Sequence, residues 1–167
     1  MGNIAAIQSF GPQEGISMLN TKQISVFLEN KPGRLANVLS ALAREKVNVT
    51  ALTVMDSHEH SVLRFVTGDT PGTLVVLKGL GIPYAETDVV LVELKNQPGA
   101  LAHVCEMLAE EHINIDYCYA SSGGKNGRVF GIFKVSSTDK AVKLLTGGGK
   151  KRNEVRPLRD RRSYQAR

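Results

Sequence analysis

The stretch that decides the fold is Asn30-Lys31-Pro32-Gly33-Arg34-Leu35. Before it, apolar residues alternate from Ile24 to Leu28, which is the period of a half-buried β-strand. After it, apolar residues recur with helical spacing from Leu35 to Ala43. The sequence therefore predicts a strand, a tight turn and a helix. Pro32 is expected to be the first helical residue, because the N–H that proline lacks would be unpaired there in any case.

Gly33 makes this turn a candidate anion site. Glycine has no Cβ, so a ligand can approach its backbone closely. The first N–H groups of a helix lack intrahelical partners and carry the positive end of the helix dipole. A carboxylate or another small anion fits such a helix start. The alternative is purely structural: Gly33 makes the turn, Asn30 caps it and Leu35 belongs to the core.

Around this turn the sequence predicts the order strand-helix-strand-strand-helix-strand. The helix is expected over 32–46, a second strand over 47–55, a polar hairpin loop at 56–60 and a third strand over 62–67. A second helix is expected from Pro71 to about Leu80, with Thr70 as its N-cap, and a fourth strand after Ile82.

The same order returns 66 residues later, which indicates an internal duplication. The shift maps Asn30, Pro32, Gly33 and Leu35 onto Asn96, Pro98, Gly99 and Leu101, and Asn48 onto Asn114. The second copy departs from the first near its end. Gly147-Gly148-Gly149 interrupts it, and its last strand is expected between Glu154 and Leu158.

In the order of elements, the Asn-x-Pro-Gly-x-Leu turn, and the Asn-Val or Asn-Ile after the first helix, both copies resemble the ACT domain family. ACT domains are small-molecule-sensing modules of regulated enzymes in amino-acid metabolism. The resemblance covers 22 to 145 and is closest to stand-alone tandem ACT proteins. It implies an α+β fold of two ferredoxin-like βαββαβ modules, with antiparallel sheets and helices on one face. It also implies sheets joined edge to edge and amino acids bound at domain interfaces beside the Pro-Gly turn.

The candidate ligand-binding residues are the two turns and the first residues of the strands that follow the helices. They are Asn30, Lys31, Pro32, Gly33, Arg34, Leu35, Asn48 and Val49 in the first copy, and Asn96, Gln97, Pro98, Gly99, Ala100, Leu101, Asn114 and Ile115 in the second. The turn amides suit a ligand carboxylate, and the asparagine amides offer both a donor and an acceptor, with Asn48 and Asn114 suited to an α-amino group. Arg34 could pair with a ligand carboxylate, but a solvated residue at the helix start is the favoured interpretation. A basic side chain there gains nothing from the helix dipole, so some other partner is plausible.

The expected sheet is apolar on its open face as well. If Val49 and Ala51 face the helices, then Leu52 and Val54 face away from them, as Phe27 does. The third strand of each copy is also apolar on both faces. Such a surface suggests a partner, most simply a second copy of the chain, although scattered surface hydrophobics are common.

Little in the sequence favours catalysis. His58-Glu59-His60 is a weak metal signal in a hairpin loop, Cys105 lies on an apolar helix stripe, and Cys118 has no evident base nearby. There is no P-loop, GxGxxG or HExxH motif. No cofactor is therefore expected, and the chain is predicted not to be an enzyme.

Charge is concentrated at the C-terminus. The net charge is +5 over 167 residues, but the segment 150–167 alone holds eight Lys or Arg residues against two acidic ones, so the rest is close to neutral. This tail could bind nucleic acid, but its arginines lack interleaved aromatic residues, so a solvated tail is the favoured interpretation. Two cysteines, no membrane-length apolar run and no secretory signal pattern suggest a cytoplasmic protein.

The sequence thus predicts an N-terminal extension (1–21), ACT-like domains at 22–88 and 89–149, and a basic tail (150–167). The function expected is regulation through binding of an amino acid or similar small carboxylate, in a homodimer that passes its state to a partner protein. The alternative is a protein–protein adaptor whose ligand sites are vestigial. Nucleic acid is an unlikely partner, and no membrane partner is expected.

Overall fold

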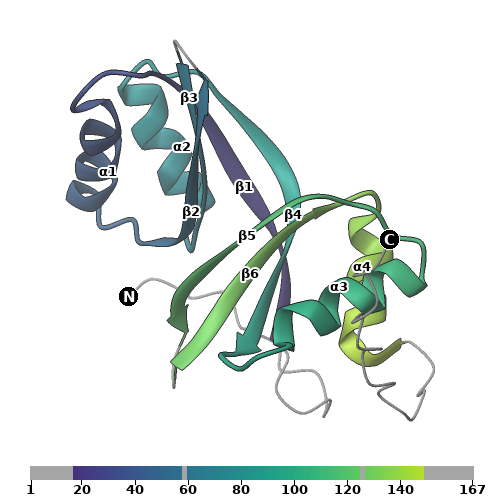
Figure 1. Cartoon of the computed structure of the whole chain (residues 1–167). Coiled ribbons are helices and arrows are strands. Elements are labelled where there is room, and N and C mark those ends of the chain that lie inside the picture. The colour runs from purple at the N-terminus through teal and green to yellow at the C-terminus, as the bar shows by residue number, and fades with distance from the viewer. Residues whose placement is uncertain (1–16, 58–59, 125–126, 149–167) are drawn as a thin grey trace, which may run out of the picture.

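The computed structural model describes residues 17–57, 60–124 and 127–148 (Figure 1). The first half of the described chain contains β1 (Ser17–Glu29), α1 (Arg34–Arg44), β2 (Val49–Ser57), β3 (His60–Thr67) and α2 (Thr70–Gly79). The second half contains β4 (Tyr84–Lys95), α3 (Ala100–Glu110), β5 (Ile115–Gly124), β6 (Arg128–Val135), α4 (Thr138–Lys143) and a final turn, η2 (Leu144–Gly148). The two predicted βαββα patterns are confirmed.

All six strands form one antiparallel sheet in the order β2-β3-β1-β4-β6-β5. The strand β4 is long and uninterrupted. Its first residues complete the ferredoxin-like order of the first module, and its last residues begin the second module. The predicted boundary between residues 88 and 89 therefore lies inside β4.

The strand β1 is also shared between the modules, because it begins at Ser17, before the expected start. Its residues 17–20 pair with residues 93–90 of β4. In a ferredoxin-like module the fourth strand lies beside the first, so these residues occupy the place expected for the fourth strand of the second module. The strand predicted between Glu154 and Leu158 lies outside the described residues.

A pseudo-twofold axis passes between β1 and β4. Lys22 lies opposite Asp88 in the register of these strands, and the two residues are themselves equivalent under the 66-residue repeat. Their side chains form a 2.8 Å ion pair. The second module thus completes its sheet with residues 17–20, which come before the first module in the sequence.

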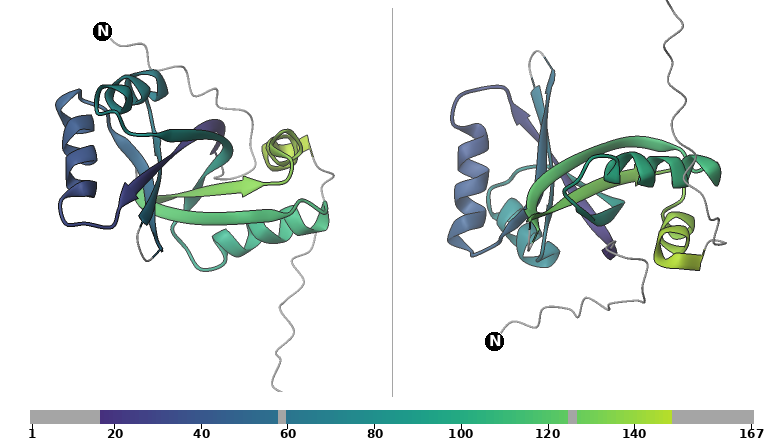
Figure 2. Two further views of the ribbon diagram at one scale, coloured as in Figure 1. Left: turned by 90° about the horizontal axis from the view of Figure 1, so that it is seen from above. Right: turned by 60° about the horizontal axis from the view of Figure 1, so that its bottom comes forward.

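All four helices pack on the same face of the continuous sheet. They enclose two separate hydrophobic cores. The first core lies under α1 and α2 and includes Ile24, Val26, Val38, Leu42, Leu63, Phe65 and Leu77. The second lies under α3 and α4 and includes Val90, Val92, Val104, Leu108, Phe133 and Val135. The sheet twists so strongly that the two helix pairs lie at opposite ends of the molecule (Figures 1 and 2).

The opposite face of the sheet is covered within the chain. Ala51, Val66, Val89 and Ile132 are buried together there, with Leu91 and Tyr119 packed against them. These residues come from β2 and β3 of one half and β4, β5 and β6 of the other, so the open faces of the two modules cover each other. This contact accounts for much of the apolar open face that the sequence assigned to a second copy. Phe27 remains 51% exposed on that face.

A β-bulge between Val49 and Ala51 reverses the facing of the rest of β2. Val49 packs on the first core, whereas Ala51 pairs with Val66 on the open face. The expectation that Leu52 and Val54 face away from the helices is therefore wrong. They pair with the core residues Phe65 and Leu63, and so point to the helix side. An equivalent bulge lies between Ile115 and Tyr117.

Two helix starts also differ from expectation. Gly33 is the N-cap of α1, so Pro32 precedes the helix instead of beginning it. The N-cap of α2 is Asp69, whose carboxylate accepts a 2.9 Å hydrogen bond from the Gly72 N–H, which makes Thr70 the first helical residue. A shorter side chain was expected to cap this helix, but aspartate one residue earlier does so equally well.

Candidate ligand-binding site

The two Pro-Gly turns have nearly identical backbone geometry. Gly33 has φ of 85° and ψ of −16°, and Gly99 has φ of 86° and ψ of −15°. This left-handed region suits glycine, because a Cβ strains the backbone there. A Cβ built on either glycine would meet no atom within 4 Å, so the space beside each turn is open.

Each turn begins a helix whose N-cap residue has no side chain. In α1 the first intrahelical bond runs from Asn37 N–H to Gly33 C=O at 2.9 Å, and in α3 the equivalent bond runs from His103 to Gly99. Because glycine is the N-cap of both helices, the N–H groups of the second and third helical residues receive no side-chain cap from that residue.

The first turn has basic side chains that the second lacks. Arg34 Nη2 lies 2.7 Å and Lys31 Nζ 3.1 Å from Glu29 Oε2. Glu29 is therefore the partner expected for Arg34, and it was not identified from the sequence because it lies outside the Asn-x-Pro-Gly motif. The second turn has Lys95, Gln97 and Ala100 at the equivalent positions.

The hydrogen bond and charge of Arg34, followed by those of Lys31, lower the pKa of Glu29 below its usual value of 4.5. A lowered pKa means that the ion pair stabilises the fold above the unfolded-state pKa and is lost as the pH falls through the folded-state pKa. We expect Arg34→Ala to raise the pKa of Glu29, as measured by NMR titration of its carboxyl carbon. Lys22→Ala, far from this turn, is the control and should leave it unchanged; an unshifted pKa in Arg34→Ala would contradict the ion pair.

The structure does not bring the turn of a module together with the asparagine after its helix. Asn30 and Gly33 precede α1, whereas Asn48 follows it. The helix has 11 residues, and its rise of 1.5 Å per residue separates its two ends by about 16 Å. The same holds for Gly99 and Asn114 on either side of α3. One module therefore cannot place both groups on a single small ligand.

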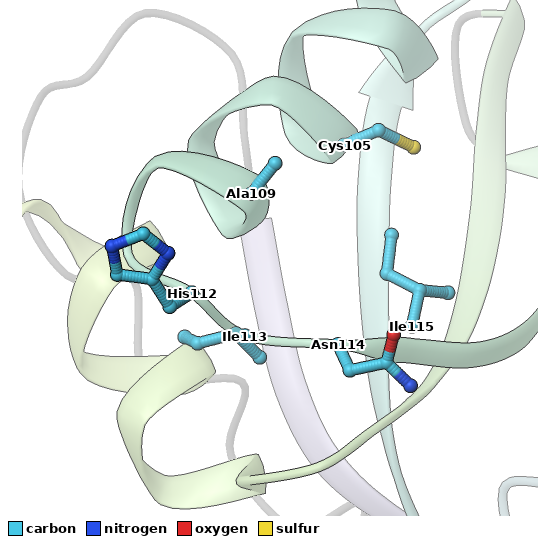
Figure 3. Close-up of a pocket in the computed structure, with 6 residues that line it drawn as sticks. All are labelled: Cys105, Ala109, His112, Ile113, Asn114 and Ile115. Carbon is cyan, nitrogen blue, oxygen red and sulfur yellow. The ribbon is translucent and has the colours of Figure 1, made fainter.

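Asn114 instead lines a shallow, open depression at the C-terminal end of α3 (Figure 3). Its lining residues are Cys105, Ala109, His112, Ile113, Asn114 and Ile115. The Asn114 Nδ2 donates to Asp116 Oδ1 at 2.9 Å, and its main chain is held by Ser136 on both sides. In Figure 3 the amide nitrogen points away from α3 and the oxygen lies on the helix side. The amide oxygen is thus the group that Asn114 offers as an acceptor.

The other predicted site residues lie at the surface. Lys31, Pro32, Arg34, Asn48, Asn96, Gln97 and Pro98 are exposed, and Val49, Ala100 and Ile115 are half-buried. Under the structural interpretation, Leu35 and Leu101 were both core residues. Leu35 does pack on the first core, but Leu101 is 40% exposed.

A polar cluster between the modules was not predicted. Gln23 is fully buried; its Nε2 donates to Tyr117 Oη at 2.8 Å, and its Oε1 accepts from Tyr119 Oη at 3.2 Å. Its Nε2 also lies 3.2 Å from Ser25 Oγ, and the guanidinium of Arg64 stacks 4.1 Å from the centre of the Tyr117 ring. The repeat did contain a signal for this cluster. Gln23 and Ser25 are polar, whereas the residues at the equivalent positions of the second copy, Val89 and Leu91, are apolar.

The described residues contain no cluster of three or more His, Cys, Asp or Glu side chains that could hold a metal ion. Of the His58-Glu59-His60 motif, only His60 lies in the described part, in β3. Cys105 is half-buried on the second core and Cys118 is exposed. Among the described helices, none is long and apolar enough to cross a bilayer.

Comparison with known proteins agrees with this architecture. The family model of the ACT domain pair matches residues 19–148. A protein of known crystal structure from Bacteroides thetaiotaomicron is 35% identical, with a TM-score of 0.69 over 77% of this chain and 88% of its own. A comparison with functionally curated proteins gave no match.

Two regulatory subunits of aspartate kinase share the fold at lower identity. The subunit from Thermus thermophilus, in a ligand-free form, is 18% identical, with a TM-score of 0.58 over 78% of this chain and 94% of its own. The subunit from Thermus flavus is 19% identical, with a TM-score of 0.56 over 78% and 92%. The match of the family model over most of the sequence, the duplicated Pro-Gly turns and the shared sheet together show that the chain belongs to the ACT domain pair family.

Proposed function

We propose that this chain is a regulatory sensor that binds a free amino acid or similar small carboxylate and has no catalytic activity of its own. The observation that carries the proposal is the duplicated turn. In both copies a left-handed glycine, which has no side chain to cap the helix, precedes the first helical residue, and the space beside that glycine is open. A ligand carboxylate is the group that such amides bind best.

The fold supports a regulatory role. The regulatory subunits of aspartate kinase from Thermus thermophilus and Thermus flavus share this fold over 94% and 92% of their own length. The ligand's α-amino group needs an acceptor such as the Asn114 oxygen. Because the turn and the asparagine of one module are too far apart, we place each complete site between two modules.

The proposal is tested by a thermal-shift panel of the twenty amino acids, together with mass spectrometry of small molecules that co-purify with the native protein. We expect at least one amino acid to raise the melting temperature at millimolar concentration, because a ligand that binds only the folded state stabilises it. If none does, while the protein still retains a specific protein partner, the adaptor function is the correct one.

Gly33→Val is expected to abolish this ligand response while the fold survives, because a β-branched residue strains the left-handed turn and narrows the approach to the amides. Gly81→Val is the matched control. Gly81 also has a positive φ, of 64°, and an equally open surrounding, but it follows α2 instead of preceding a helix, so it presents no helix-start amides. An unchanged ligand affinity in Gly33→Val, or an equal loss in Gly81→Val, would remove this turn from the site. If only one turn binds ligand, we expect it to be the turn at Gly33.

A further inference from the structure

The surface formed by α3 and the start of β5 is acidic and has no basic residue to balance it. Residues 96–124 include four carboxylates and no Lys or Arg. The four are Glu106, Glu110, Glu111 and Asp116, which we call the acidic face. All four are exposed, and no Lys or Arg among the described residues forms an ion pair with any of them. The equivalent residues of the first copy, 30–58, instead hold four Lys or Arg against two acidic residues.

Two members of the acidic face lie at the rim of the depression of Figure 3. Burial raises the pKa of the Cys105 thiol, and the charges of Cys118 and then Glu106 raise it further, so Glu106 lies near this lining residue. On the other side, Asp116 Oδ1 accepts a 2.9 Å hydrogen bond from Nδ2 of Asn114, which also lines the depression. Carboxylates therefore flank the depression on two sides.

The floor of the depression is largely apolar, with Ala109, Ile113 and Ile115 among its lining residues. Glu110 and Glu111 stand beside this floor, at the C-terminal end of α3. The negative end of a helix dipole adds to their attraction for a cation. An occupant that fits this surface has aliphatic side chains for the floor and positive charge around them.

Residues 149–167 of the same chain have this chemistry. They include eight Lys or Arg residues against two acidic ones. Their aliphatic residues are flanked by positive charge, since Val155 precedes Arg156 and Leu158 precedes Arg159. Charge and apolar content both match the acidic face.

The described part of the chain ends close to the depression. Leu145 of η2 is buried in the same core as Ile113, which lines the depression, and η2 contacts α3. Five residues separate Leu145 from Lys150, which is at most about 17 Å of extended chain. The helix α3 is itself about 16 Å long. The basic segment thus begins within reach of the acidic face of its own chain.

We propose that residues 150–160 dock on the acidic face of the same chain, with Val155 and Leu158 on the apolar floor and the neighbouring basic side chains paired with the four carboxylates. A single exposed ion pair contributes little, but a short tether holds the segment at a high effective concentration. Docking also engages the Lys and Arg side chains that binding to nucleic-acid phosphates would need. The proposed function assigns this segment no role, and the docking does not rest on the proposed ligand.

Limited trypsin digestion of the full chain at low salt, without ligand, tests the docking. Mass spectrometry follows cleavage after Arg152 and Arg159. We expect Glu106→Gln/Glu110→Gln to speed this cleavage at least about threefold, because two exposed ion pairs are lost. Salt at about 0.5 M should speed cleavage of the wild type in the same way, because it screens these pairs.

The control is Glu45→Gln/Glu86→Gln, which removes two exposed carboxylates from the first module and should leave the cleavage rate unchanged. All of the substituted residues are exposed, so circular dichroism should show the same fold in both variants. Amide NMR spectra of the full chain and of a chain that ends at Gly149 locate the contact. We expect the shifts to fall within residues 105–116.

Equal cleavage rates in the wild type and Glu106→Gln/Glu110→Gln would overturn the proposal, as would amide shifts confined to other parts of the chain. Protection from trypsin that is lost on dilution would assign the contact to the basic segment of a second copy. Protection that appears only with an added DNA duplex would assign the segment to nucleic acid. Either result would overturn docking within one chain. Because no amino acid is present, these results are independent of the ligand experiments.

Discussion

Replacing Gln23 with leucine is expected to lower the free energy of unfolding by about 2 kcal/mol, because the substitution leaves the hydroxyls of Tyr117 and Tyr119 without their partner. Gln23 is fully buried, and no buried side-chain N or O atom among the described residues lacks a hydrogen-bond partner. Chemical denaturation, followed by circular dichroism, measures the change. Leucine has nearly the same volume as glutamine, so cavity formation contributes little.

The matched control removes both tyrosine hydroxyls together with Gln23. In a Gln23→Leu/Tyr117→Phe/Tyr119→Phe chain the Ser25 hydroxyl is the one partner of Gln23 that remains, and most of the lost stability should return, since replacing both partners of a buried hydrogen bond is nearly neutral. Val89, which is the repeat counterpart of Gln23, is apolar and fully buried, so the sheet tolerates an apolar residue at this position. If the triple variant were as unstable as the sum of its parts, hydrogen bonding would not explain the role of Gln23.

Deleting residues 1–20 is expected to destabilise the protein by about 2–4 kcal/mol, because the ladder hydrogen bonds between residues 17–20 and residues 90–93 of β4 are lost. The deletion also exposes the edge of β4, which favours aggregation through unpaired strand groups. Denaturation and light scattering measure the two effects. Deletion of residues 1–16 alone is the control, as it keeps all of β1.

The two deletions distinguish a shared strand from a dispensable extension. If the shorter and the longer deletion had the same stability, residues 17–20 would not complete the second module. A larger loss from the longer deletion would show that the second module depends on a segment more than 60 residues before it in the sequence.

Local features were predictable from the sequence. The turns at Gly33 and Gly99, the helices after them and the strands around them follow from alternation, helical spacing and glycine chemistry over a few residues. The 66-residue repeat strengthened each of these predictions, since two copies of one pattern had to agree. The family follows from the same residues.

The wrong predictions of side-chain direction concern a strand in which one extra residue reverses the side to which all the following residues point. A bulge at residue 50 reversed the sides assigned to Leu52 and Val54, because facing alternates along a strand and one extra residue exchanges the two faces. Nothing in the composition of this segment marks the bulge. The register of β2 and β3 is what places the exposed Leu52 and Val54 side chains on the helix side.

The turns and helix ends of the candidate site were predictable, but the distance between them was not. That the turn residues and the asparagines after the helices bind a ligand stays a prediction, and the sequence did not show that a helix of about 16 Å separates them within one module. The buried contacts of Gln23 were not predicted from the sequence for a similar reason. Polar residues that alternate along a single strand predict that one face of the strand is exposed to solvent. Here that face is buried, because the second module covers it.

The sequence by itself determined the repeat, the elements of each module and the tight Pro-Gly turns between strand and helix, because these depend on interactions between residues close together in the chain. Only the tertiary structure decided that β1 and β4 are shared by both modules, that the open faces cover each other, and that Leu52 and Val54 point to the helix side. Those features depend on pairings across 60 to 100 residues, where strand register and sheet twist, instead of local preference, select which side chains meet.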